Sequence, residues 1–167
     1  MSRVHKLILL LAALAMGLGL LSFVAKRQVA PELSLKSLAG DSVQLSALRG
    51  KVVLVAFWAT SCLDCEETLP WLATLQRRHQ SQGLEALAVA MRYDQPQQVA
   101  SYAFRHSLPF PVALDEDGET ARRFGNVQTL PTLFVLDRRG QIVQRLLGNP
   151  DHGRLQSLLD KLLAEKP

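Results

Sequence analysis

The sequence predicts an α/β domain in which a mixed central β-sheet is flanked by helices. Strand-like runs of β-branched and aromatic residues alternate with stretches of helical periodicity. The chain then closes with a strand–turn–strand hairpin and an amphipathic helix, an order typical of a sheet covered on both faces. Its 167 residues, 48% hydrophobic and 20% charged, suit one globular domain and exclude disordered and collagen-like proteins.

The net charge of +4 is confined to the N-terminal segment. Residues 1–27 hold four of the 19 basic residues and no acid, so 15 basic and 15 acidic residues remain from Gln28 onward. A neutral domain lacks the basic surface that binds a phosphate backbone. No nucleic-acid partner is therefore expected.

Residues 1–30 are expected to form a membrane anchor and a linker, followed by one domain over 31–167. Residues 7–25 are 19 residues without a charge, roughly 28 Å as a helix against a hydrocarbon core of about 30 Å. Neither Phe23-Val24-Ala25 nor Gln28-Val29-Ala30 begins with the small residue of a signal-peptide cleavage site. We therefore predict an uncleaved N-terminal transmembrane helix, with everything after Lys26 exported and a cleaved signal peptide as the alternative.

The exported part begins with a loose hairpin over residues 33–45, turned at Gly40-Asp41. The run KVVLVAFW at 51–58 is typical of a strand buried on both faces. A helix is expected over 62–79, with a kink at Pro70.

The remaining elements continue the alternation. Residues 84–91 follow Gly83 and precede Asp94 and Pro96, so we predict a short strand rather than a helix. The elements expected after it are a helix at 97–106, a strand at 110–114, a helix at 119–124, strands at 132–136 and 142–147, and a closing helix at 153–163. Side chains expected in the core are Trp71, Phe104, Phe124 and Phe134, and those expected in solvent are Arg122, Arg123, Arg138 and Arg139.

Cys62 and Cys65 are the only cysteines and lie where the buried strand gives way to a helix. Two cysteines exclude a disulfide framework and a four-cysteine zinc site. Free amides of a first helical turn stabilise an anion, so the pKa of the Cys62 thiol should be lowered and Cys62 should attack. Cys65, one turn further, is placed to resolve a mixed disulfide. Inert buried thiols and half of an intermolecular metal site are the alternatives.

The segment FWATSCLDC at 57–65, with Leu130-Pro131-Thr132 downstream, resembles the thioredoxin superfamily. Within that superfamily, the chain resembles the TlpA/ResA-like anchored thiol–disulfide oxidoreductases of the bacterial envelope, because it has Pro70, the predicted anchor and an extra stretch at 84–113. The resemblance covers about residues 31–165. This resemblance implies a thioredoxin-like fold with an extra strand–helix insertion. It also implies a redox-active Cys62–Cys65 disulfide, no other cofactor, and a cis Pro131 against the cysteine pair.

Our hypothesis is an enzyme that reduces protein disulfides rather than making them, in a docking groove shaped by Trp58, Leu130 and Pro131. Electrons would come from a membrane thiol donor, and cytochrome c maturation is one destination. The domain would face the periplasm from a single span in the bacterial inner membrane.

The charges near the cysteines favour the reducing direction. Asp64, Glu66 and Glu67 lie close to the thiols, and no basic residue occurs between Lys51 and Arg77. Negative charge opposes a thiolate, and a less stabilised thiolate favours a more reducing couple.

The sequence departs from the family pattern at Ser61, which makes the recognition surface smaller and more polar, and at Leu63-Asp64, which replaces the common proline-containing dipeptide. Ala56 and Thr68 stand where relatives carry acids, so Glu67 is the one candidate proton acceptor for Cys65, with a solvated glutamate as the alternative. Three other functions stay open. One is a disulfide-forming oxidase on the same scaffold. Another is a peroxiredoxin-type peroxidase, disfavoured because Cys62 lacks a Pro-x-x-x-Thr-x-x-Cys context. The third is a copper or metal carrier using both thiolates and His106, although His79, His106 and His152 follow no ligand spacing.

Overall fold

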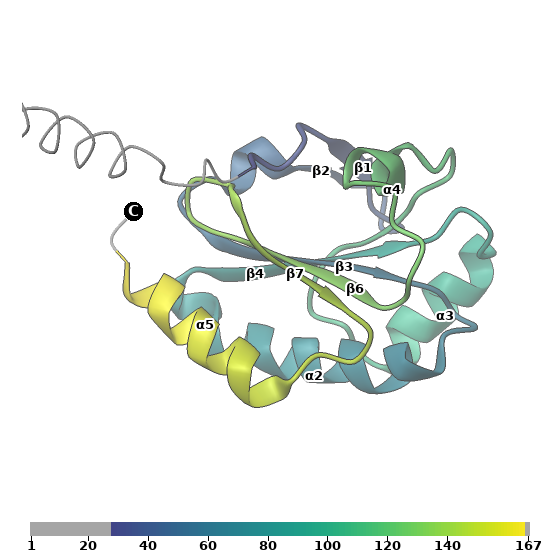
Figure 1. The fold of residues 1–167 in the computed structure, drawn as a ribbon. Helices are drawn as coiled ribbons and strands as arrows, with labels where there is room; N and C mark the ends of the chain where they lie inside the picture. The colour runs from purple at the N-terminus through teal and green to yellow at the C-terminus, as the bar shows by residue number, and fades with distance from the viewer. Residues whose placement is uncertain (1–27, 166–167) are drawn as a thin grey trace, which may run out of the picture.

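The computed structural model describes residues 28–165 of the chain (Figure 1). The transmembrane helix predicted for 7–25 lies outside these residues, as does nearly all of the segment assigned to anchor and linker. Within residues 28–165, no helix has the length and apolarity needed to cross a membrane.

Five strands form the central sheet, in the order β5-β4-β3-β6-β7. Strand β3 pairs in parallel with β4 and antiparallel with β6, so the sheet is mixed as predicted. Every residue of β3 is buried, because helices and loops cover both faces. The strands are β3 (Val52–Trp58), β4 (Leu84–Ala90), β5 (Val112–Leu114), β6 (Thr132–Leu136) and β7 (Ile142–Leu147).

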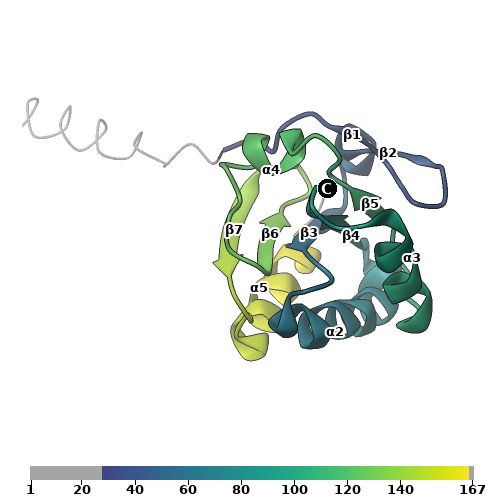
Figure 2. The same ribbon diagram turned by 90° about the vertical axis from the view of Figure 1, so that its right-hand side faces the viewer.

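The two faces of the sheet carry different layers (Figure 2). Helices α2 (Leu63–His79), α3 (Pro96–Arg105) and α5 (His152–Ala164) cover one face. The short helix α4 (Glu119–Arg123) and the hairpin of β1 (Ser34–Lys36) and β2 (Ser42–Gln44) cover the other. Alternate side chains of β3 enter the two cores, as the two-residue period of a strand requires.

The predicted elements are confirmed in type and order, with small differences at their ends. Strand β5 begins at Val112 rather than at 110, and the proline at 111 has no N–H to give to a ladder. Helix α2 runs through Pro70 without interruption to His79, and the kink expected there stays a prediction. Two 3-10 turns, Leu45–Leu48 and Gln80–Gln82, were not anticipated.

Two of the side-chain expectations concerning aromatic residues are wrong or incomplete. Phe104 was expected in the core but is 86% exposed. Helix α3 turns Val99 and Tyr102 inward, and at about 100° per residue Phe104 lies roughly 200° beyond Tyr102, on the outer face. Trp71 is only partly buried and stacks on the ring of His152 at a centroid distance of 3.8 Å. Phe124 and Phe134 are buried as expected.

Arg138 was expected in solvent and instead ties several segments together. Its guanidinium donates to four backbone carbonyls, those of Gly50 (2.6 Å), Gln82 (3.1 Å), Leu163 (3.0 Å) and Glu165 (2.9 Å). These carbonyls belong to the loop before β3, the turn before β4 and the end of α5. The neighbouring Arg139 is exposed, as expected.

The described chain enters the domain beside the turn between β6 and β7. Ile142 N–H donates to Gln28 O (2.8 Å) and Ala30 N–H donates to Gly140 O (2.9 Å). Because β6 is antiparallel to β3 and Leu136 pairs with Val53, this entry lies at the end of the sheet where β3 begins.

Candidate active site

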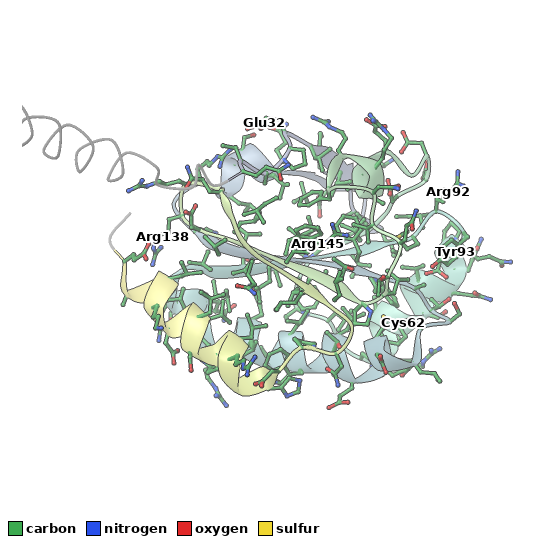
Figure 3. The ribbon with its side chains drawn as sticks, in the orientation of Figure 1. Glu32, Cys62, Arg92, Tyr93, Arg138 and Arg145 are labelled. Carbon is green, nitrogen blue, oxygen red and sulfur yellow. A yellow bond between two sulfur atoms is a disulfide. The ribbon has the colours of Figure 1, made fainter. Side chains whose placement is uncertain are left out.

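The cysteine pair lies at the opposite end of β3, where that strand gives way to α2 (Figure 3). Cys62 is the N-cap of α2 and is joined to Cys65 by a disulfide bond. A turn from Ala59 precedes it, in which Cys62 N–H donates to Ala59 O at 3.1 Å. Cys62 is partly exposed, whereas Cys65 is 1% exposed. The pair therefore lies at the helix start, as predicted, and Cys65 is the less exposed of the two sulfurs, whereas the attacking and resolving roles stay a prediction.

The Leu130–Pro131 peptide bond is cis, as the resemblance implied. It precedes β6, and Thr132 pairs with Phe57, so Pro131 lies at the same end of the sheet as the cysteines. Pro131 is buried, while Leu130 is partly buried and packs against the core cluster that Cys62 also touches.

Trp58 has no exposed surface at all. It lies in the core cluster with Cys65, and its ring is 4.7 Å from that of Tyr102. Trp58 can therefore shape a groove only from beneath, by supporting the residues that face solvent.

The acids around the pair have a histidine neighbour that the sequence did not suggest. Asp64 and Glu66 occupy the first turn of α2, where the helix end also offers its free amides. Helix α3 brings a base to this turn, because His106 Nε2 lies 3.8 Å from Glu66 Oε2. Because only the residues between Lys51 and Arg77 were considered from the sequence, a contact with His106, which is distant in the chain, was not predicted.

Glu67 was the candidate proton acceptor for Cys65. Its side chain is exposed, and its Oε2 accepts a hydrogen bond from Asn149 Nδ2 at 3.0 Å. The described contact of Glu67 is thus with the loop before α5, and its role as a proton acceptor stays a prediction.

Tyr102 is a neighbour of the pair that sequence reasoning missed. Its hydroxyl donates to the backbone oxygen of Cys65 at 3.4 Å, and its ring stacks on His106 at 4.1 Å. Burial raises the pKa of Tyr102 to about 12, and the nearby Glu66 carboxylate adds to the effect. The phenol therefore stays protonated and remains a hydrogen-bond donor. The sequence did offer one signal for the inward position of Tyr102, because Val99 and Tyr102 are three residues apart and therefore share one face of the helix.

A second missed contact joins the loop before Cys62 to the loop after β4. Asp94 is 8% exposed, and its carboxylate accepts hydrogen bonds from Thr60 N–H (2.9 Å) and Thr60 Oγ1 (2.8 Å). From the sequence, Asp94 was used only to predict where the strand at 84–91 ends, and its contact with Thr60 was not predicted.

The three histidines of the described chain contact side chains other than the cysteines. His79 is buried, with Nδ1 3.2 Å from Gln82 Oε1 and Nε2 3.3 Å from Gln156 Nε2. His106 and His152 stack on aromatic rings. Within residues 28–165, no group of three or more His, Cys, Asp or Glu side chains is arranged to hold a metal ion.

Known proteins resemble this chain in sequence and in fold. The model of the AhpC/TSA family matches residues 27–145. The thiol-disulfide oxidoreductase ResA of Geobacillus thermodenitrificans is 35% identical over 148 residues, 85% of this chain and 83% of the relative. ResA of Bacillus thuringiensis subsp. konkukian is 31% identical over 134 residues, 80% of this chain and 76% of the relative.

Solved structures agree. A thiol:disulfide interchange protein of the thioredoxin family from Chlorobium tepidum has a TM-score of 0.76 at 25% identity, covering 84% of this chain and 99% of its own. A second Chlorobium tepidum structure, described as that of a DsbE-type thiol:disulfide interchange protein, has a TM-score of 0.76 at 29% identity, covering 83% of this chain and 98% of its own. With a disulfide-bonded Cys-x-x-Cys pair at the start of α2, the chain belongs to the AhpC/TSA family and is a thioredoxin-like thiol–disulfide oxidoreductase of the ResA and DsbE type.

Proposed function

We propose that this oxidoreductase is held to the bacterial inner membrane by residues 7–25 and reduces protein disulfides on the periplasmic side. Its electrons come from a membrane thiol donor, and cytochrome c maturation is the process it serves. The substrate docks along Leu130 and Pro131, with Trp58 supporting that surface from below.

The unequal exposure of the two cysteines carries the proposal. A visiting disulfide can reach Cys62, which is partly exposed, but not Cys65, which is 1% exposed. Cys62 is also the residue that faces the free amides of α2, where a thiolate is stabilised. Cys62 is therefore the attacking sulfur, and Cys65 resolves.

The two cysteines and the substrate disulfide account for all the electrons and sulfur bonds of the exchange, so no cofactor is needed. The Cys62 thiolate attacks one sulfur of the substrate disulfide, and the other substrate sulfur leaves as a thiolate that takes up a proton. Cys65, once deprotonated, attacks Cys62 Sγ in the mixed disulfide and releases the second substrate thiol. The protein is left with the Cys62–Cys65 disulfide, and two electrons from the donor dithiol reduce it again.

The acids near the pair support the reducing direction. Asp64 and Glu66 place negative charge in the first turn of α2, which opposes the Cys62 thiolate and thereby favours the oxidised protein. Glu66 is exposed, so solvent weakens this effect without reversing its sign.

Trapping in the native envelope tests the proposal. In Cys65→Ser, the mixed disulfide at Cys62 cannot be resolved, so covalent complexes should accumulate and identify both substrate and donor by mass spectrometry. Cys62→Ser serves as the matched control and should capture nothing. If Cys62→Ser captures partners and Cys65→Ser does not, the roles of the two cysteines are reversed.

A redox titration of the full-length chain then decides the direction. A midpoint well below that of the envelope is expected for a reductase, whereas a high midpoint supports the oxidase alternative. Turnover of hydrogen peroxide by the same protein would support the peroxidase alternative instead.

A further inference from the structure

Asp94 is one of the buried acids of the described chain. It is 8% exposed, lies in the loop between β4 and α3, and both of its carboxylate oxygens are used by a single residue, Thr60. Burying a carboxylate is costly unless hydrogen bonds compensate for the lost water. The two bonds from Thr60, at 2.9 and 2.8 Å, supply that compensation.

Thr60 connects Asp94 to the reactive sulfur. It lies two residues before Cys62, inside the turn in which Cys62 N–H donates to Ala59 O at 3.1 Å. The position of Thr60 thus constrains the backbone that presents Cys62 at the start of α2. The hydroxyl of Thr60 also lies 3.5 Å from Gln98 Oε1 on α3, but only Asp94 holds both its N–H and its hydroxyl.

Asp94 is itself held by the sheet. Its N–H donates to Met91 O at 2.9 Å, and Met91 N–H donates to Trp58 O at 3.0 Å, which extends the β3–β4 ladder by one residue. The loop that carries Asp94 is therefore tied by backbone hydrogen bonds to the end of the β3–β4 ladder. It joins the loops that leave two adjacent parallel strands, one of which ends at the cysteine pair.

We propose that Asp94 is a positioning residue for thiol–disulfide exchange, which acts by clamping Thr60 and so fixing Cys62 at the N-terminus of α2. The inference rests on the proposed role of Cys62 as the attacking sulfur. Attack on a disulfide requires a defined approach of the nucleophile, and small displacements of a reacting group lower rates strongly. Without the clamp, the turn from Ala59 to Cys62 loses its connection to β4.

Variants of Thr60 and Asp94 in the full-length chain test this role. The rate constant is measured for the reaction of the reduced protein with Ellman's reagent, a small disulfide that needs no docking surface. Asp94→Ala should lower the rate by about tenfold. Thr60→Val, which keeps the shape but loses the hydroxyl, should lower it by roughly threefold. Thr60→Ser restores the hydroxyl and should recover most of the rate.

Asp115 provides the matched control. It is 2% exposed, follows β5, and accepts from Thr120 N–H and Ala121 N–H at 2.9 Å each, so its carboxylate holds α4 on the face of the sheet opposite α2 (Figure 2). Asp115→Ala should destabilise the fold to a similar extent without changing the rate per folded molecule. If it lowers that rate as much as Asp94→Ala does, the role assigned to Asp94 is wrong.

If circular dichroism shows that Asp94→Ala does not fold, the two variants Thr60→Val and Thr60→Ser decide the outcome. A Thr60→Val rate equal to that of the parent, or a Thr60→Ser rate as low as that of Thr60→Val, overturns the inference. The parent chain is measured in the same assay. A parent without exchange activity contradicts the proposed function as well, whereas an active parent with unaffected variants contradicts only the role of Asp94.

Discussion

Replacing Arg138 should cost the domain a large part of its stability. Its guanidinium donates to Gly50 O and Leu163 O in partly buried surroundings, and to Gln82 O and Glu165 O at the surface. Water can replace the two surface bonds, so we count only the partly buried pair. At about 1.5 kcal/mol for each bond to a charged donor, Arg138→Ala should lose about 3 kcal/mol of unfolding free energy.

Urea and thermal unfolding of the full-length chain in mild detergent measure this loss. At about 3 °C per kcal/mol for a chain of this length, the melting temperature should fall by about 10 °C. Arg139→Ala is the control, because this neighbouring arginine is exposed and its removal should change the free energy by less than about 0.5 kcal/mol. A loss at Arg138 no larger than that at Arg139 would refute the reasoning.

Three further predictions follow from the burial of particular side chains and from the raised pKa of Tyr102. In the reduced protein, iodoacetamide should label Cys62 about tenfold faster than Cys65, which is 1% exposed, and equal labelling by peptide mass spectrometry would contradict the assigned roles. Since the pKa of Tyr102 is raised to about 12, the folded state keeps a proton that the unfolded state releases, so stability should fall between about pH 10 and 12. Tyr102→Phe should flatten that part of the stability profile, and an unchanged slope would show that another group causes it. Phe134→Ala should cost about 3–5 kcal/mol and Phe104→Ala less than about 0.5 kcal/mol in urea unfolding, so similar costs would contradict their placement.

Local sequence patterns were sufficient for most of the fold. The run at 51–58 became β3 because seven consecutive apolar residues need cover on both faces, and the glycines and prolines around it mark where the chain turns. The cysteine pair could be placed at a helix start for the same reason, since a buried strand was followed by a helical period.

Contacts between distant segments could not be predicted in this way. Asp94 and Thr60 are 34 residues apart, and Arg138 and Gly50 are 88 apart, so no local period connects either pair. Phe104 was placed in the core because it is a large apolar residue, although the helical period sets it opposite Val99 and Tyr102 and α3 turns it to solvent. Side-chain placement depends on which face the neighbouring layer covers, and that becomes visible only in three dimensions.

The point at which the chain enters the domain has a consequence for encounters with partners. Gln28 lies beside Ile142, at the start of β3, whereas the sulfurs follow the end of that strand, roughly 20 Å away at about 3.3 Å per residue. A protein held by the segment before Gln28 would point its reactive tip away from the bilayer. Such an orientation favours partner proteins that arrive from the aqueous compartment. A donor embedded in lipid would need thiols that extend out of the bilayer as far as the cysteine pair.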